Sequence, residues 1–314
     1  MNCIETSNLH KSFGSVKALQ KVDVVVKKGS IHGFLGPNGA GKTTTIKTIL
    51  GLLKANQGHI KVFDQKVQFG QTETLLQEIG YLPQDPVFPE HYNAIEVMEL
   101  TAQMYGISRQ VAVPRIKELL KYYELNKDAT RLVKNYSKGM KQRLGLATVW
   151  LPEPKLLILD EPVSALDPEG RYYVLEQIKQ IKNQGTTVFF SSHILSDVER
   201  VADKVTIINK GQILLEKSTD DMRSNYVGSA YVVKVTPEQQ NQAQQLLQSL
   251  DEVKNVTVKG SSISFQNPQA EPAEFSKLIL NTLLHSDIGV LKFTTVEPTL
   301  EDVFLNLING GESA

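Results

Sequence analysis

A glycine-rich segment, GPNGAGKTT, follows a short apolar run, and its residue types suit the binding of a triphosphate. It fits the pattern G-x-x-x-x-G-K-[ST], in which Lys42 contacts the β- and γ-phosphates and the Thr43 hydroxyl binds Mg²⁺. Glycines let successive backbone N–H groups turn inward around an anion, and the start of the following helix adds its positive dipole end. The predicted nucleotide-binding residues of this loop are Gly36, Pro37, Asn38, Gly39, Ala40, Gly41, Lys42, Thr43 and Thr44.

Three carboxylates, Asp160, Glu161 and Asp167, follow an unbroken aliphatic run in LLILDEPVSALD. Such a run is typical of a strand covered on both faces, although periodicity alone does not exclude a short buried helix. One interpretation is structural: the strand ends, Pro162 fixes a turn, and an acid caps the next helix. The other is functional, because ligands of open α/β sheets bind beyond the carboxyl ends of the strands.

The glycine-rich loop favours the functional interpretation of these acids. In P-loop nucleotidases an Asp at the end of a neighbouring buried strand binds the Mg²⁺ that the loop hydroxyl also holds. We therefore predict Asp160 as a metal ligand. Glu161 then lies beside the γ-phosphate, where a carboxylate orients or deprotonates the attacking water, so we predict it as the general base.

These motifs, together with YLPQDP, YSKGMKQR, SALD and TTVFFSSH, occur in the order typical of one family. From about residue 4 to residue 220 the chain resembles the ATP-binding subunits of ABC transporters. The resemblance implies an ATPase that binds ATP and Mg²⁺, forms a homodimer on ATP and powers a separate transmembrane permease. It also implies that each ATP lies between the P-loop of one subunit and the signature motif of the other.

The segment YSKGMKQR corresponds to the family's signature motif, whose serine and glycine contact the γ-phosphate held by the opposing subunit. Ser137 and Gly139 occupy these two positions. Tyr136, Lys138 and Met140 stand where the common form, LSGGQ, has Leu, Gly and Gln, so the two anion-binding positions are kept. In a chain without a P-loop, Ser137 would be interpreted as the N-cap of the following helix.

Four more residues receive roles from the resemblance. Gln84 corresponds to the Q-loop, which joins the metal site to the membrane partner, and Asp167 to the D-loop at the dimer interface. His193 corresponds to the switch histidine that contacts the γ-phosphate, and Phe13 to the adenine-stacking aromatic, usually Tyr. Each has a plainer interpretation: a loop residue for Gln84 and His193, and a core residue for Phe13.

The motifs must be positioned by a parallel α/β sheet, the P-loop nucleotidase fold. Between Ile31 and Asn209, β-like runs alternate with longer helix-like segments. These runs are IHGFL, GHIKVF, LLILD, TTVFFSS and KVTIIN. Before them, ALQKVDVVVKKGS alternates Val with charged residues, which predicts an antiparallel β element at the side of the sheet. From about residue 92 to 151 the spacing of apolar residues predicts a helical insert.

The composition changes after Lys217, and the order strand, helix, strand, strand, helix, strand predicts a small α+β, ferredoxin-like unit. Its Gln-rich stretch keeps an apolar stripe at Leu246, Leu247 and Leu250, which indicates a helix with a solvated face. We predict an ABC ATP-binding domain over residues 1–220. Residues 221–314 are predicted to form an accessory domain that regulates the ATPase or supports dimerisation.

The final segment VEPTLEDVFLNL, residues 296–307, narrows the branch of the family. It resembles the E-P-[ST]-L-E-D-V-F segment of ATPases that serve drug, sodium, lipid or polysaccharide exporters whose permease is a separate chain. The resemblance implies export. An amphipathic terminal helix explains the same apolar spacing, and the two interpretations are compatible.

Bulk composition does not favour a nucleic-acid or membrane-surface partner, which would have to be bound by a local patch. Lys plus Arg equals Asp plus Glu at 34 each, so no global basic field favours nucleic acid or a membrane surface. Cys3 is the only cysteine, which excludes an internal disulfide and fits a reducing compartment. No apolar run approaches the ~20 residues of a membrane span. We expect a soluble, cytoplasmic chain that is peripheral to the cell membrane and contacts it only through the permease.

Two other functions fit part of the pattern. A soluble ABC-type ATPase of translation or DNA maintenance is disfavoured because such proteins carry two cassettes or a long coiled coil. A nucleotide-responsive regulator without a permease would use the C-terminal unit as a ligand sensor. The cargo is not predicted, because specificity should belong to the permease, which is another chain.

Overall fold

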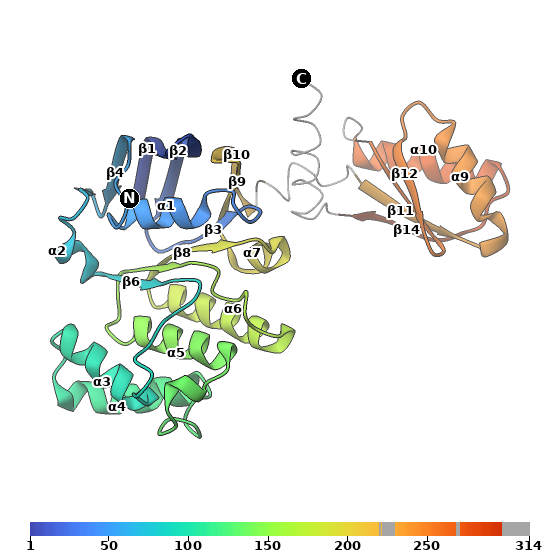
Figure 1. Ribbon diagram of the computed structural model, residues 1–314. Helices are drawn as coiled ribbons and strands as arrows, with labels where there is room; N and C mark the ends of the chain where they lie inside the picture. The colour runs from blue at the N-terminus through green and yellow to red at the C-terminus, as the bar shows by residue number, and fades with distance from the viewer. Residues whose placement is uncertain (220, 222–229, 268–270, 297–314) are drawn as a thin grey trace. The chain divides into compact units, whose positions relative to one another are not determined.

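The computed structural model describes residues 1–219, 221, 230–267 and 271–296 (Figure 1). The chain divides into two compact units, Met1–Lys217 and Ser218–Ala314, and each has its own core. In the described part of the chain, every helix lacks the length or the apolar character that crossing a membrane requires. The terminal segment from residue 297 onward, which carries most of VEPTLEDVFLNL, lies outside the described residues.

The first unit is built on a six-stranded sheet in the order β10-β9-β3-β8-β7-β6, and the pairs β9/β3, β3/β8, β8/β7 and β7/β6 are parallel. All residues of β3, β7 and β8 are buried, as expected of strands covered on both faces. The predicted parallel core is therefore confirmed. The strands are β3 (Ile31–Leu35), β6 (Ile79–Leu82), β7 (Leu156–Leu159), β8 (Thr187–Ser192), β9 (Lys204–Asn209) and β10 (Gln212–Ser218).

A second sheet of the first unit, in the order β2-β1-β4-β5, confirms the predicted antiparallel element. Its strands are β1 (Asn2–Phe13), β2 (Val16–Lys27), β4 (Gln57–Val62) and β5 (Gln65–Lys66). The assignment of GHIKVF to the parallel sheet was wrong, since this run forms β4 and pairs with β1. Exposed and buried residues alternate at the end of β4, the pattern of a strand with one solvated face. The short strand β6 was not predicted.

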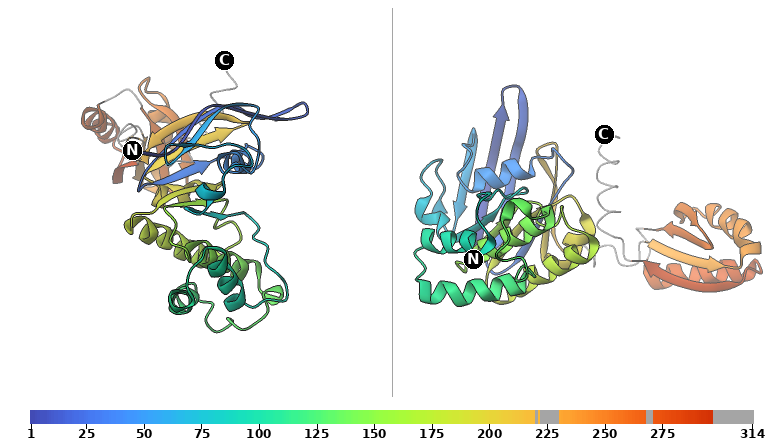
Figure 2. Two further views of the ribbon diagram at one scale, coloured as in Figure 1. Left: turned by 90° about the vertical axis from the view of Figure 1, so that its left-hand side faces the viewer. Right: turned by 60° about the horizontal axis from the view of Figure 1, so that its bottom comes forward.

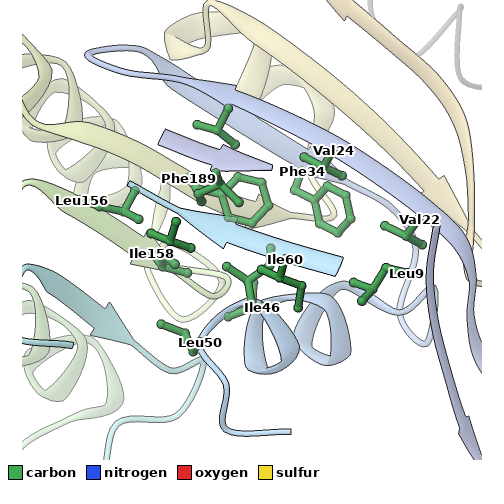
Figure 3. Close-up of a cluster of buried hydrophobic side chains, with 14 of the residues drawn as sticks. Leu9, Val22, Val24, Phe34, Ile46, Leu50, Ile60, Leu156, Ile158 and Phe189 are labelled. Atoms are coloured by element: carbon green, nitrogen blue, oxygen red, sulfur yellow. The ribbon is translucent and has the colours of Figure 1, made fainter. Parts of the chain in front are cut away.

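Helix α1 (Lys42–Ile49) lies between the two sheets of the first unit. Ile46 of α1 belongs to one buried cluster with Leu9 and Val24 of the antiparallel sheet and with Phe34 and Ile158 of the parallel sheet (Figure 3). The helix that follows the glycine-rich loop is thus fixed from both sides. Because the loop ends at this helix, its position is fixed as well, and a site that orients a ligand requires such a fixed position.

The predicted helical insert is present and lies on the side of the parallel sheet away from the antiparallel one (Figures 1 and 2). Its first helix begins with a capping box, in which Asn93 Oδ1 accepts from the N–H of Glu96 and Glu96 Oε2 accepts from that of Asn93. The insert comprises α3 (Ala94–Met104), α4 (Arg109–Tyr122), the short helix η1 (Val133–Asn135) and α5 (Lys138–Trp150). The other helices of the unit are α2 (Glu73–Leu76), α6 (Pro168–Asn183) and α7 (Leu195–Val201).

The second unit has the predicted ferredoxin-like order of elements, and its sheet, β12-β13-β11-β14, pairs antiparallel throughout. Its core joins Tyr231 and Phe265 of the sheet to Leu247 and Ile279 of the helices. The Gln-rich stretch is helical, with Ala243 and Leu247 buried, so the predicted apolar stripe is confirmed. The elements are β11 (Ala230–Val235), η2 (Pro237–Gln239), α9 (Gln240–Gln248), β12 (Lys254–Lys259), β13 (Ser262–Gln266), α10 (Pro272–His285) and β14 (Val290–Val296).

Candidate nucleotide-binding site

The glycine-rich loop connects β3 to α1, and its backbone requires glycine at three positions. Gly39 and Gly41 have φ angles of 80° and 110°, in the left-handed region that side chains disfavour. A Cβ at Gly36 would lie 2.3 Å from the carbonyl oxygen of Ile208 in β9. The loop therefore turns tightly against the sheet and ends at α1, where the free N–H groups of the first turn attract an anion.

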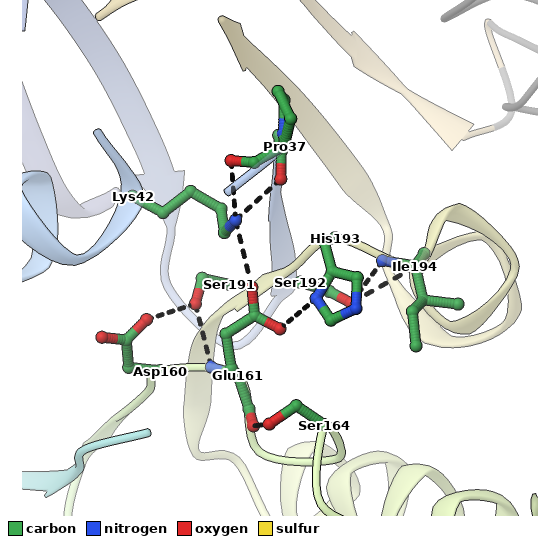
Figure 4. A network of polar contacts seen from close by, with 10 residues as sticks. Pro37, Lys42, Asp160, Glu161, Ser164, Ser191, Ser192, His193 and Ile194 are labelled. Carbon is green, nitrogen blue, oxygen red and sulfur yellow. Dashed lines mark hydrogen bonds and ion pairs between the residues drawn. The ribbon is translucent and has the colours of Figure 1, made fainter. Parts of the chain in front are cut away.

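Lys42, the first residue of α1, is 6% exposed, and its ammonium group is held by the loop itself (Figure 4). Its Nζ donates hydrogen bonds to the carbonyl oxygens of Gly36, at 2.7 Å, and Pro37, at 3.2 Å. It also forms an ion pair with Glu161 Oε1 at 3.0 Å. A buried ammonium needs an anionic partner, and here the partner is a carboxylate that bound phosphate oxygens would compete with.

Asp160 follows β7, and Ser191 of the adjacent strand β8 positions it. The Ser191 hydroxyl donates to Asp160 Oδ1 at 2.6 Å and accepts from the Glu161 N–H at 2.9 Å. Asp160 is buried, and its second oxygen, Oδ2, has no hydrogen-bond partner among the described residues. Burial, followed by the charge of Asp160, raises the pKa of Tyr81 to about 12. A buried carboxylate oxygen without a donor suits a cation, so the residues present fit Mg²⁺.

Glu161 adopts a left-handed backbone conformation with φ of 53°. For a non-glycine residue this costs on the order of 1–3 kcal/mol, and such strain is concentrated at functional sites. The side chain is buried, and its Oε2 lies 2.6 Å from Nδ1 of His193 (Figure 4). One carboxylate therefore joins the lysine of the glycine-rich loop to the predicted switch histidine. Glu161 is therefore an acid that can accept a proton, and His193 is in contact with it.

A cavity of about 600 Å³, hereafter the first cavity, opens beside the loop and α1. The predicted residues that line it are Asn38, Gly39, Gly41, Lys42, Thr43, Thr44, Gln84 and Glu161. Six lining residues were not predicted: Val16, Lys17, Ala18, Gln20, Lys210 and Gly211. The last four come from two segments far apart in the chain that meet closely, as shown by the 2.8 Å hydrogen bond from the Gln20 N–H to the Gly211 carbonyl.

Phe13, the predicted adenine-stacking residue, ends β1 near the first cavity but is not among the residues that line it. It is 49% exposed, so the alternative interpretation as a core residue is wrong. The Lys11 ammonium lies 4.9 Å from the centre of its ring. An exposed ring can stack on a base without hydrogen bonds, so the role of Phe13 stays a prediction.

Ser137, Gly139 and Asp167 do not line the first cavity. They line a second cavity of about 620 Å³, between α5 and α6, and the two cavities share no lining residue. Ser137 Oγ accepts from the Met140 N–H at 3.2 Å, and Asp167 Oδ1 accepts from the Gly170 N–H at 2.9 Å. Both side chains are N-caps, which agrees with the alternative interpretation of Ser137 as a helix cap. Both residues also line the second cavity.

The remaining predicted ligand, Gln84, follows β6 and lines the first cavity. Within the residues that the structure describes, no three His, Cys, Asp or Glu side chains form a metal-binding cluster. The predicted Mg²⁺ site is not of that kind, because it combines one carboxylate, Asp160, with the Thr43 hydroxyl, the Gln84 amide and the phosphates of the substrate. Mg²⁺ is usually held in this way, by few protein ligands.

Comparison with known proteins identifies the family of the chain. The ABC transporter family model matches residues 19–164, and a model of the C-terminal domain of DrrA1-3-like ATP-binding proteins matches residues 218–308. The bacitracin transport ATP-binding protein BcrA of Bacillus licheniformis is 36% identical over 310 residues, 98% of this chain and 98% of the relative. The daunorubicin resistance ATP-binding protein DrrA3 of Streptomyces coeruleorubidus is 30% identical over 304 residues, 97% of this chain and 95% of the relative.

Solved structures give the same fold for the first unit. An ATP-binding subunit of an ABC transporter covers 71% of this chain and 93% of its own, with a TM-score of 0.66 and 32% identity. A cassette solved as a dimer in a post-hydrolysis state with ADP and phosphate covers 69% and 98%, with a TM-score of 0.64 and 23% identity. The predicted resemblance is confirmed: the chain belongs to the ATP-binding subunits of ABC transporters and is an ATPase that uses ATP with Mg²⁺.

Proposed function

We propose that two copies of this chain form a head-to-tail homodimer with two shared ATP sites, and that hydrolysis there powers export through a separate permease. The observation that carries the proposal is the division of the predicted residues between two cavities. The first cavity holds the loop, Gln84 and Glu161, and the second holds Ser137, Gly139 and Asp167. A two-fold axis would bring the first cavity of each chain to the second cavity of the other.

Residues that line the first cavity, together with Asp160, His193 and Phe13 outside its lining, divide the work of hydrolysis. Lys42 and the N–H groups of the loop hold the β- and γ-phosphates, and Thr43, Gln84 and Asp160 hold the metal. When bound, Mg²⁺ would neutralise charge on the phosphates. Glu161 accepts a proton from the attacking water, and His193, 2.6 Å from its Oε2, orients this carboxylate and contacts the γ-phosphate. Phe13 stacks on the adenine.

The phosphates also change the partners of Glu161. Its Oε1 is 3.0 Å from Lys42 Nζ, and phosphate oxygens that attract this ammonium free the carboxylate to act on water. The base is therefore released by the substrate on which it acts. Ser137 and Gly139 of the opposing chain complete the contacts to the γ-phosphate, and Asp167 shapes the interface, so hydrolysis is coupled to dimerisation.

The relatives support an exporter. The two relatives above are named for bacitracin transport and daunorubicin resistance. A third, the LnrL protein of Bacillus subtilis, is named for linearmycin resistance; it is 32% identical over 305 residues, 97% of this chain and 97% of the relative. We infer a cytoplasmic subunit that is peripheral to the membrane through its permease, with no nucleic-acid partner. An antibiotic is the first class of cargo to test. The second unit is proposed as an accessory domain that regulates the ATPase or supports dimerisation.

Purification of the chain from detergent-solubilised membranes of its native cell tests the proposed partnership. We expect an integral membrane protein with several spans to copurify in a fixed ratio, and the ATPase rate of the complex to respond to added candidate cargo. A chain that hydrolyses ATP at full rate and never associates with a membrane protein would favour the alternative, a regulator without a permease.

Replacing Lys42 with alanine is expected to weaken ATP binding by at least about tenfold, because a charge-assisted contact in a buried pocket contributes ~1.5–3 kcal/mol. Isothermal titration with Mg²⁺ and a slowly hydrolysed ATP analogue measures the effect. Lys47→Ala is the matched control, since Lys47 lies on the same helix but is exposed. Equal affinity of the Lys42→Ala and Lys47→Ala proteins would contradict the assignment of the loop.

A further inference from the structure

Lys138 forms an ion pair that connects the two half-sites of one chain. Its Nζ lies 2.9 Å from Oδ1 of Asp85, and the two side chains are 62% and 69% exposed. Asp85 directly follows Gln84, which lines the first cavity. Lys138 stands between Ser137 and Gly139 and, like them, lines the second cavity. The ion pair thus links the loop that carries Gln84 to the segment that carries Ser137.

The charges around the second cavity make Lys138 the cation available to an incoming anion. Glu124, Asp167 and Glu169 line this cavity together with Lys138 and Arg143. Arg143 is already paired, at 2.9 Å, with Glu124. Three acids therefore face two bases, and without Lys138 the remaining base of the lining, Arg143, would already be paired. The partner of Lys138, in contrast, lies outside the cavity lining.

The local setting of Lys138 does not explain its charge. It is the first residue of α5, and the first turn of α5 has no acidic residue. A cation at a helix N-terminus opposes the helix dipole, so the position favours neutral or acidic side chains. The exposed pair with Asp85 offsets little of this, because such pairs contribute weakly. The lysine is therefore not explained by the stability of the helix.

We propose that Lys138 transfers from Asp85 of its own chain to the γ-phosphate of the nucleotide held by the opposing chain. The proposal rests on the shared-site dimer proposed above. A contact between an ammonium group and a phosphate oxygen is stronger than an exposed carboxylate pair, so the exchange is favourable. It also releases Asp85, and the loop that follows β6 then responds to ATP bound on the other chain. ADP lacks the γ-phosphate and leaves the Asp85 pair intact.

The transfer predicts opposite effects for the two partners of the ion pair. In a Glu161→Gln background with Mg²⁺ and ATP, Lys138→Met is expected to weaken the dimer at least about tenfold, the effect of one lost charge-assisted contact. Asp85→Asn frees the lysine and is expected to tighten the dimer by up to about fivefold, the contribution of one exposed pair. With ADP neither variant should change the mass distribution, as measured by sedimentation over a concentration series.

A charge exchange separates phosphate binding from a mere tether between the two segments. The double variant Asp85→Lys with Lys138→Asp keeps an ion pair but turns an acid toward the phosphate, so its ATP dimer should be at least as weak as that of Lys138→Met. Recovery of the parent affinity by the double variant would overturn the proposal in favour of a tether. Lys138→Gln provides a second neutral variant, and its expected effect equals that of Lys138→Met.

Two controls are matched in charge. Lys134→Met removes an exposed lysine that lines neither cavity, and Glu78→Gln removes a partly exposed acid paired with Lys155 at 2.8 Å. Both should dimerise like the parent. If the parent dimerises on ATP but Lys138→Met matches it, the role of Lys138 is wrong and the dimer stands. If the parent stays monomeric, the shared-site dimer is wrong and the role of Lys138 fails with it.

Discussion

The Glu161→Gln protein is expected to hydrolyse ATP about 10²- to 10⁴-fold more slowly than the native chain, because an amide cannot accept the proton that a general base removes from water. ATP binding should be retained, since the amide has nearly the same shape. The structure adds that Lys42 loses its 3.0 Å ion pair with this side chain and remains free for phosphate oxygens. Single-turnover hydrolysis and ATP titration separate the two effects.

Glu216→Gln is the matched control for this substitution. Glu216 is a partly buried acid of β10 that pairs with Lys204, outside both cavities. Its replacement should leave the rate of hydrolysis within about twofold, the effect expected of a pair that is partly exposed. A Glu161→Gln protein that turned over at the rate of the Glu216→Gln protein would place the base elsewhere.

Ser137→Arg is expected to slow ATP hydrolysis strongly without weakening ATP binding to the chain that carries it. Ser137 lines the second cavity, which shares no residue with the first, so the substitution leaves the loop and Lys42 untouched. The long side chain places bulk where we propose that the γ-phosphate contact forms, which should lower kcat by more than about tenfold through loss of a charge-assisted contact. Steady-state hydrolysis and ATP titration are the two measurements.

Loss of the N-cap is the competing explanation, because Ser137 Oγ accepts from the Met140 N–H and removing a cap costs ~1 kcal/mol. Asn93→Arg removes a true cap, that of α3, where Asn93 Oδ1 accepts from the Glu96 N–H outside both cavities, and should leave turnover intact. Mixing Ser137→Arg with Lys42→Ala chains should restore activity, because a mixed dimer contains one intact site. Activity of the mixture equal to the mean of the two proteins would point to a site within one chain.

Much of the site was predictable because its motifs are continuous in sequence. The glycine-rich pattern predicts a strand before it and a helix after it, and it also predicts the phosphate-binding role of Lys42. Asp160 and Glu161 follow from a second local rule, that a buried parallel strand ends at the ligand side of its sheet. The structure places both acids there, with Glu161 beside Lys42 and His193.

The rest of the site depends on contacts between distant segments. Ser191 positions both acids from the neighbouring strand, but in sequence it is one more polar residue before His193. Gly211 comes within hydrogen-bonding distance of Gln20 although nearly the whole sequence of the first unit separates them, and no local pattern predicts this contact. The run GHIKVF was assigned to the wrong sheet because a strand's partners, unlike its propensity, are set by the tertiary fold.

The ion pair between Lys42 and Glu161 was also beyond sequence analysis. The two residues were assigned separate roles, one on the phosphates and one on water, whereas the structure joins them at 3.0 Å. Lys138 was noted only as a departure from the common signature motif, and its pairing with Asp85 becomes visible only when the insert packs beside β6. In both cases the ion pair joins residues of two different motifs, so no single motif predicts it.

The mass of the Glu161→Gln protein in solution, determined by light scattering with Mg²⁺ and ATP, with Mg²⁺ and ADP, and without nucleotide, tests the shared-site dimer most directly. The two cavities of one chain are separate, so ATP should join two chains through contacts that neither makes alone. We predict the mass of two chains with ATP and of one chain in the other two conditions. A single-chain mass at saturating ATP would contradict the account.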